Sequence, residues 1–205
     1  MVARLVEAGH DVGALGSTAD KRRELERLGA NAVKDIAAAA TRADVVVVCV
    51  FTDAQVRQVC LDSSLLHTMP PGSALVVHTT TNPKTIEAIA AGPVEVVDAP
   101  VSGGPHDIAA GTLTLFVGGA DDAVARVRPV LSCYGDPILH VGPRGAGQKV
   151  KLVNNALFSG QIGLLAESIR LGERLGAPES TLLDALPHGS AASRVLNIVA
   201  ARGSI

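Results

Sequence analysis

The run DVVVVCV at residues 44–50 decides the fold class of this chain. It is apolar without alternation, which predicts a strand that is buried on both faces of a sheet. The segment TDAQVRQVC at residues 52–60 then has the pattern of a helix, and SALVVHT at residues 73–79 has that of another strand. Strands separated by helices in this way are typical of βαβ units with a mostly parallel sheet.

The same alternation extends in both directions from these strands. Helices are predicted at residues 1–9, 20–29, 83–91 and 121–131, and strands at residues 10–16, 94–100, 112–119 and 136–141. Gly9 and Gly29 are natural helix stops, and Pro83 suits the first position of its helix. Thr18 or Ser17 can cap the helix that follows them.

The pattern changes near Gly147, where a long helical segment at residues 148–176 begins and two shorter ones follow. We therefore expect an α/β domain over residues 1–146 and the start of an all-α domain over residues 147–205, joined by the long helix. The chain opens on a helix and stops after three helical segments, so both ends are expected to be cut. The last helices are apolar, and a second subunit or further sequence is expected to cover them, which predicts a homo-oligomer.

Composition excludes several functional classes. The 205 residues carry a net charge of −2 and include no Trp, one Tyr and three Phe, which argues against a nucleic-acid partner. The apolar runs are too short to span a bilayer, so no membrane partner is expected. The three cysteines form no disulfide framework, which favours a reducing, cytoplasmic location. Histidines and cysteines show no metal-ligand spacing, and no metal site is predicted.

Two polar groups stand out against this apolar background. Lys151 and Asn155 are four residues apart in a predicted helix, so both side chains project from one face. A lysine that exchanges a proton beside a hydrogen-bonding amide suits the protonation of a carbonyl oxygen. Upstream, Ser102, Gly103 and Gly104 combine a hydroxyl with consecutive backbone N–H groups, which is a pattern that binds anions.

Two longer motifs contain these groups, DAPVSGGPHDIAAGTLTLFVGG at residues 98–119 and GAGQKVKLVNN at residues 145–155. Both resemble segments of the β-hydroxyacid dehydrogenases, a family that includes 3-hydroxyisobutyrate dehydrogenase and tartronate semialdehyde reductase and is related to 6-phosphogluconate dehydrogenase. The resemblance extends over essentially the whole chain. It implies a Rossmann-like α/β domain, NAD or NADP as cofactor, and hydride transfer between the cofactor and a small 3-hydroxy acid or its semialdehyde.

On the substrate side, the resemblance implies that Lys151 is the general acid/base. It also implies that Ser102, Gly103, Gly104 and Asn155 orient a carboxylate-bearing substrate. Asn155 could instead form a buried hydrogen bond between helices, and the glycines could belong to an ordinary turn. The family has a small Gly-Ala step where this chain has Asp107 and Ile108. The favoured interpretation of His106 and Asp107 is an ordinary pair of surface residues. The alternative is that their polar groups alter which substrate is bound.

On the cofactor side, the resemblance implies contacts from Val50, Phe51, Thr80 and Ser17. Each of these residues also has a structural interpretation. Phe51 could simply pack at the strand end, and Thr80 could cap a helix. The hydroxyls at 17–18 could likewise cap the helix that follows them. Lys21, Arg22 and Arg23 are near enough in sequence to meet a 2′-phosphate, and the choice between NAD and NADP stays open.

The family begins with a glycine-rich strand-turn-helix that the given sequence does not contain. A fragment, a truncated gene model and an impaired protein are all compatible with that difference. The alternative functions are an imine reductase-like relative, which the lysine argues against, and a catalytically impaired chain that only oligomerises or binds a partner.

Overall fold

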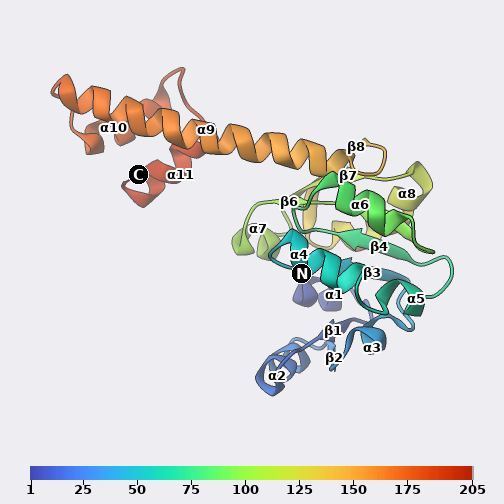
Figure 1. Ribbon diagram of the computed structural model, residues 1–205. Coiled ribbons are helices and arrows are strands. Elements are labelled where there is room, and N and C mark those ends of the chain that lie inside the picture. The colour runs from blue at the N-terminus through green and yellow to red at the C-terminus, as the bar shows by residue number, and fades with distance from the viewer. Residues whose placement is uncertain (205) are drawn as a thin grey trace. The chain divides into compact units, whose positions relative to one another are not determined.

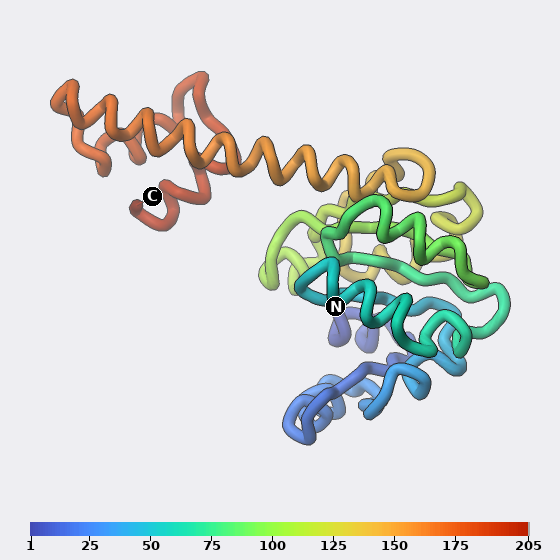
Figure 2. The backbone as a smooth tube through the Cα atoms, in the orientation of Figure 1, coloured from blue at the N-terminus to red at the C-terminus, as the bar shows by residue number. Residues whose placement is uncertain are grey.

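The computed structural model describes residues 1–204 and separates the chain into two compact units. Unit 1 is Met1–Lys151 and unit 2 starts at Leu152. The boundary falls inside the long helix α9 (Ala146–Arg174), which Figures 1 and 2 show as one continuous element. The division into domains at residues 1–146 and 147–205 stays a prediction.

Unit 1 contains a mostly parallel sheet, as predicted. Its strands follow the order β3-β4-β5-β7-β6, and β8 pairs with β7. The strands are β3 (Val45–Val48), β4 (Ala74–Val77), β5 (Glu95–Asp98), β6 (Val101–Ser102), β7 (Leu113–Gly118) and β8 (Gly135–Gly142). Pairing is parallel for β3–β4, β4–β5 and β7–β8, while β7 runs antiparallel to β5 and β6. A separate parallel pair joins β1 (Gly13–Leu15) to β2 (Asn31–Val33).

The helices of unit 1 follow the predicted segments and add short ones between them. They are α1 (Val2–Glu7), α2 (Ala19–Arg27), α3 (Ile36–Ala40), α4 (Asp53–Cys60), α5 (Leu65–Thr68), α6 (Pro83–Ala90), α7 (Pro105–Ala110) and α8 (Asp121–Ser132). Thr18 caps α2 through its side chain, and Pro83 opens α6. Strands β2 and β6 and helices α3, α5 and α7 were not predicted, because each is too short to show a clear period.

Alternate residues of the central strands point into two separate cores. In β4, Leu75 and Val77 belong to the cluster that packs under α3, α4, α5 and α6. Ala74 and Val76 belong to the opposite cluster, which contains the buried side chains of α8. The period of two along a strand separates the two faces, so the sheet is covered on both sides, as Figure 1 shows for α6 and α8.

Strand β3 is less buried than the sequence predicts. Val45, Val46 and Val47 are half-buried, and only Val48 is fully buried. The reason is its position: β3 pairs with β4 on one side and ends the strand order on the other. An uninterrupted apolar run fixes the strand and the sheet type, but the extent of burial depends on the neighbours.

Unit 2 has a small core of its own. It consists of the rest of α9, α10 (Glu179–Ala185), the 3-10 turn Leu186–His188 and α11 (Arg194–Arg202). Leu165 and Ile169 of α9 pack with Leu183, Leu196 and Val199, and the chain turns back along α9 in Figure 2. Other apolar side chains of α9 are exposed, Val153 at 69% and Leu164 at 70% among them. Oligomerisation through such side chains stays a prediction.

Candidate active site

The carboxyl ends of β3 and β4 are joined by hydrogen bonds. The Val50 N–H, just after β3, donates to the Thr79 hydroxyl just after β4 at 2.8 Å. That hydroxyl donates to the Val50 carbonyl at 2.9 Å. Open parallel sheets bind ligands outside the carboxyl ends of their strands. Val50, Phe51 and Thr80 therefore lie at the edge where the sequence predicted cofactor contacts.

Phe51 is not packed into the strand end. Its side chain is 94% exposed, which rules out the strand-end interpretation. Its backbone is nevertheless held, because its N–H donates to Gln55 Oε1 at 2.9 Å and Thr52 and Gln55 form the capping box of α4. An exposed aromatic ring on a fixed backbone offers an apolar surface to a ligand.

Thr80 is half-buried, and within residues 1–204 its hydroxyl has no hydrogen-bond partner. The helix-cap interpretation is wrong, since Asn82 caps α6 by accepting from the Lys84 N–H at 2.9 Å. The next hydroxyl, that of Thr81, donates to Asp53. Thr80 thus keeps a free hydroxyl between two threonines whose hydroxyls are engaged.

A buried glutamine ties this strand end to the start of α9. Gln148 is 0% exposed. Its Nε2 donates to the Thr79 carbonyl at 2.9 Å, and its Oε1 accepts from the Thr81 N–H at 2.9 Å. Both backbone groups are thereby satisfied on either side of Thr80. No sequence pattern predicts this role, because a single glutamine in a helix is usually exposed.

Asp98, the last residue of β5, holds the start of α9 from another side. Its carboxylate accepts from the Gly145 N–H at 2.6 Å and from the Gln148 N–H at 2.8 Å. A negative charge is favoured at a helix N-terminus, where backbone N–H groups lack partners. Burial raises the pKa of the Asp98 carboxyl, and the surrounding backbone N–H groups oppose that shift.

Gly147 is required for this close approach. A Cβ on Gly147 would lie 2.3 Å from the Phe116 carbonyl oxygen and 2.8 Å from Asp98 Oδ2. The sheet and the first turn of α9 therefore meet with no room for a side chain.

Lys151 lies one turn beyond Gln148, on the same side of α9. It is half-buried, and desolvation lowers the pKa of its ammonium group. A lysine with a lowered pKa gives up its proton more readily near neutral pH, which a general acid/base requires. Lys149 is exposed, as the sequence predicted.

The Ser102–Gly104 segment begins at β6, four residues after Asp98. Ser102 is half-buried, and its hydroxyl has no partner within residues 1–204. Gly103 has a φ of +137°, a conformation that glycine adopts easily. The Gly104 N–H is not free, because it donates to Asp107 Oδ2 at 2.7 Å. The expectation of consecutive open N–H groups therefore fails at Gly104.

Asp107 is half-buried and supports the first turn of α7, so it is not the plain surface residue that the sequence suggested. His106 is exposed, as expected.

Asn155 lies four residues after Lys151 in α9, inside unit 2. It is exposed, and its Oδ1 accepts from the neighbouring Asn154 Nδ2 at 3.5 Å. The Asn155 side chain therefore makes no buried hydrogen bond to another helix within residues 1–204. Its role toward a substrate stays a prediction.

Ser17 follows β1 and is exposed. The capping role belongs to Thr18, whose hydroxyl accepts from the Lys21 N–H at 3.2 Å, so the cap does not use Ser17. Arg22 Nη1 donates to the Gly16 carbonyl at 2.8 Å, which places a guanidinium beside this strand end. No carboxylate occupies positions 16–18 to select a ribose 2′-hydroxyl.

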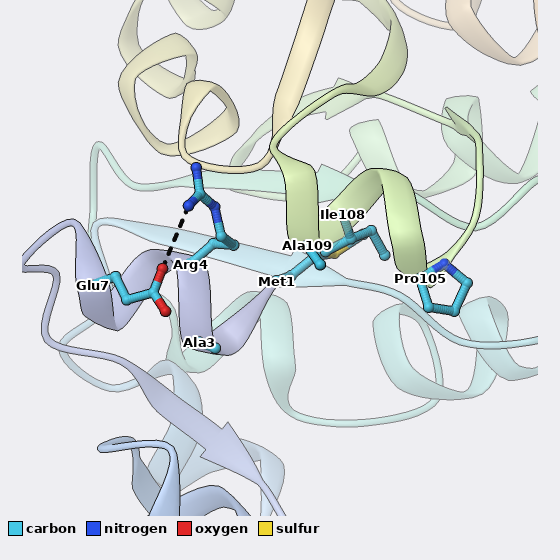
Figure 3. Close-up of a pocket in the computed structure, with 7 residues that line it drawn as sticks. All are labelled: Met1, Ala3, Arg4, Glu7, Pro105, Ile108 and Ala109. Carbon is cyan, nitrogen blue, oxygen red and sulfur yellow. Dashed lines mark hydrogen bonds and ion pairs between the residues drawn. The ribbon is translucent and has the colours of Figure 1, made fainter.

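Unit 1 has hollows on its surface, and two of them are described by their linings. One, of about 370 Å³, is lined by residues of α1 and α7, as Figure 3 shows, and contains none of the predicted site residues. The other, of about 630 Å³, includes Ser17 and Lys34.

Neither a metal-binding cluster nor a membrane-spanning helix is found within residues 1–204. No cluster of three or more His, Cys, Asp or Glu side chains there could hold a metal ion. None of the helices in the same range is long and apolar enough to cross a membrane.

Two family models match the chain. Residues 1–142 match the model described as the NAD binding domain of 6-phosphogluconate dehydrogenase. Residues 145–202 match the model described as NAD-binding of NADP-dependent 3-hydroxyisobutyrate dehydrogenase. The cofactor type expected from the sequence, NAD or NADP, is thereby confirmed.

Individual relatives agree with these matches. An uncharacterised oxidoreductase of Synechocystis is 33% identical over 100% of this chain and 73% of its own. The 3-hydroxyisobutyrate dehydrogenase of Pseudomonas aeruginosa is 33% identical over 97% of this chain and 68% of its own. Among solved structures, Mycobacterium tuberculosis 3-hydroxyisobutyrate dehydrogenase with L-serine is 29% identical, with a TM-score of 0.88 over 97% of this chain and 69% of that one.

Proposed function

Because the chain belongs to the NAD(P)-dependent hydroxyacid dehydrogenase family that includes 3-hydroxyisobutyrate dehydrogenase, we propose that it interconverts a small 3-hydroxy acid and its semialdehyde with Lys151 as general acid/base. The supporting observation is the half-buried Lys151, whose pKa is lowered by desolvation, on the first turns of α9. Gln148 and Asp98 fix those turns against the sheet edge.

The strand-end groups fit a nicotinamide dinucleotide. Thr80 has a free hydroxyl, Phe51 presents an uncovered ring, and both lie at the carboxyl ends of parallel strands. A bound nicotinamide would supply the acceptor for the hydride of the substrate's carbinol carbon. Ser17 would lie at the adenosine ribose, with the Arg22 guanidinium beside it.

Residues of the chain transfer the proton of the substrate hydroxyl and bind the substrate carboxylate. In the oxidation, neutral Lys151 takes the hydroxyl proton as the carbinol carbon loses its hydride, and the C–O bond becomes a carbonyl. In the reduction, the Lys151 ammonium returns that proton to the oxygen. The Ser102 hydroxyl and the Gly103 N–H bind the substrate carboxylate, and Gly104, which has no side chain, lets the carboxylate approach closely. Asn155 hydrogen-bonds the substrate from the next turn of α9.

The test compares Lys151→Ala, Lys151→Arg and the control Lys149→Ala. Loss of a general acid/base costs about 10²–10⁴-fold in turnover, and we expect that loss in both Lys151 variants. Arginine keeps the positive charge but does not deprotonate. The rate of alcohol oxidation by the wild type should rise with pH, because Lys151 accepts the hydroxyl proton only after it has lost its own. Equal turnover of Lys151→Ala and Lys149→Ala would contradict the proposal.

A further inference from the structure

The carboxylate of Asp107 lies against the two glycines predicted to hold the substrate. Asp107 Oδ2 accepts from the Gly104 N–H at 2.7 Å. A Cβ on Gly103 would lie 2.8 Å from the same oxygen. The Asp107 backbone is fixed as well, since its carbonyl accepts from the Thr112 N–H at 2.8 Å. The negative charge is therefore held at the loop rather than free to swing into solvent.

This charge is not neutralised locally. Within residues 1–204, Asp107 takes part in no ion pair, and its second carboxylate oxygen has no hydrogen-bond partner. The neighbouring His106 is exposed and does not bond to it. A half-buried carboxylate with an open acceptor position attracts a hydrogen-bond donor or a positive charge.

A substrate carboxylate bound by Ser102 and Gly103 would have to lie beside this charge. Two like charges at such short range repel each other, and the repulsion is stronger where the site is partly desolvated. A substrate that also carries an ammonium group would instead place a cation between its own carboxylate and that of Asp107.

We propose that Asp107 determines substrate specificity by favouring a 3-hydroxy acid with a protonated amino group next to its carboxylate over the same acid without it. This inference rests on the proposed function, because it assumes that the Ser102–Gly104 segment binds the acid.

The purely structural explanation is that Asp107 only caps α7. Asp107→Asn separates the two explanations, because asparagine keeps an oxygen that can accept from the Gly104 N–H but loses the charge. If Asp107 only caps the helix, Asp107→Asn leaves substrate preference unchanged. The matched control is Asp62→Asn, which removes an exposed carboxylate elsewhere in unit 1.

The experiment measures kcat/KM for serine, in both enantiomers, and for 3-hydroxypropionate, with NAD and NADP. We expect the wild type and Asp62→Asn to prefer serine. We expect Asp107→Asn to lower the serine to 3-hydroxypropionate ratio at least tenfold, mainly through a lower KM for 3-hydroxypropionate. A ratio within twofold of the wild type, or a wild type that prefers 3-hydroxypropionate, would overturn the role of Asp107.

Calorimetric titration of both acids into the protein loaded with oxidised cofactor measures the same preference without turnover. The protein could bind the two acids with the expected preference and yet turn over neither. That result would overturn the dehydrogenase proposal but support the role of Asp107 in specificity. If both acids are turned over and Asp107→Asn leaves their ratio unchanged, only the role of Asp107 would be overturned. Failure of both acids to bind would overturn the inference.

Discussion

Replacing Gln148 by Leu removes the side-chain amide that joins the end of β4 to α9 while nearly preserving the volume of the side chain. The amide makes two hydrogen bonds of 2.9 Å, one to the Thr79 carbonyl and one from the Thr81 N–H. All three residues are buried, with exposed fractions of 0%, 5% and 3%. Water therefore cannot easily replace the lost partners.

The expected loss of stability follows from these two backbone groups. A buried polar group that loses its partner costs about 1–3 kcal/mol. Two such groups cost about 2–6 kcal/mol, and the apolar leucine recovers about 1 kcal/mol of this by its own burial. We expect the free energy of unfolding to fall by about 1–5 kcal/mol, which is a large share of the stability of an ordinary domain.

Urea unfolding followed by circular dichroism at 222 nm measures this change. Lys149→Leu is the control, because Lys149 is exposed and surface substitutions stay within about 0.5 kcal/mol. Hydrogen exchange of the peptide that contains Thr81 reports the local bond, and we expect its N–H to lose protection in Gln148→Leu. A change no larger than that of the control, with Thr81 still protected, would refute the reasoning.

Two further predictions concern the same unit. Burial lowers the pKa of His78 to about 4, below its ordinary value of 6.5, while its Nδ1–H donates to the Ala99 carbonyl at 2.6 Å. The unfolded chain then binds more protons than the folded one, so stability is fully present above pH 6.5 and falls by about 3 kcal/mol as the pH drops to 4. Urea midpoints at several pH values test this, and the same slope in His78→Gln would argue against it. Gly147→Ala should lower the free energy of unfolding by about 1–3 kcal/mol through overpacking, since its Cβ would meet a carbonyl oxygen at 2.3 Å. Gly160→Ala in the same helix meets nothing within 4 Å and should stabilise by about 0.5–1 kcal/mol; equal thermal midpoints for these two variants would contradict the packing argument.

Local sequence was sufficient for the longer helices and strands and for the family. The apolar run at 44–50, the glycine stops and the long period of α9 each depend on residues close together in the chain, so each is visible without a structure. The two motifs at 98–119 and 145–155 are likewise continuous, and they indicated the hydroxyacid dehydrogenase family that the comparisons confirm.

The arrangement of the site depends on contacts that no local pattern encodes. Gln148 reaches Thr79 across 69 residues, and Asp98 reaches Gly145 across 47. Such bonds exist only once the parallel strands have taken their register and α9 has closed over them. The sequence alone determined that a lysine, a serine-glycine loop and strand-end hydroxyls are present. Only the tertiary structure decided which N–H groups are free, because the Asp107 carboxylate and the Gln148 amide take up backbone groups that the sequence leaves open.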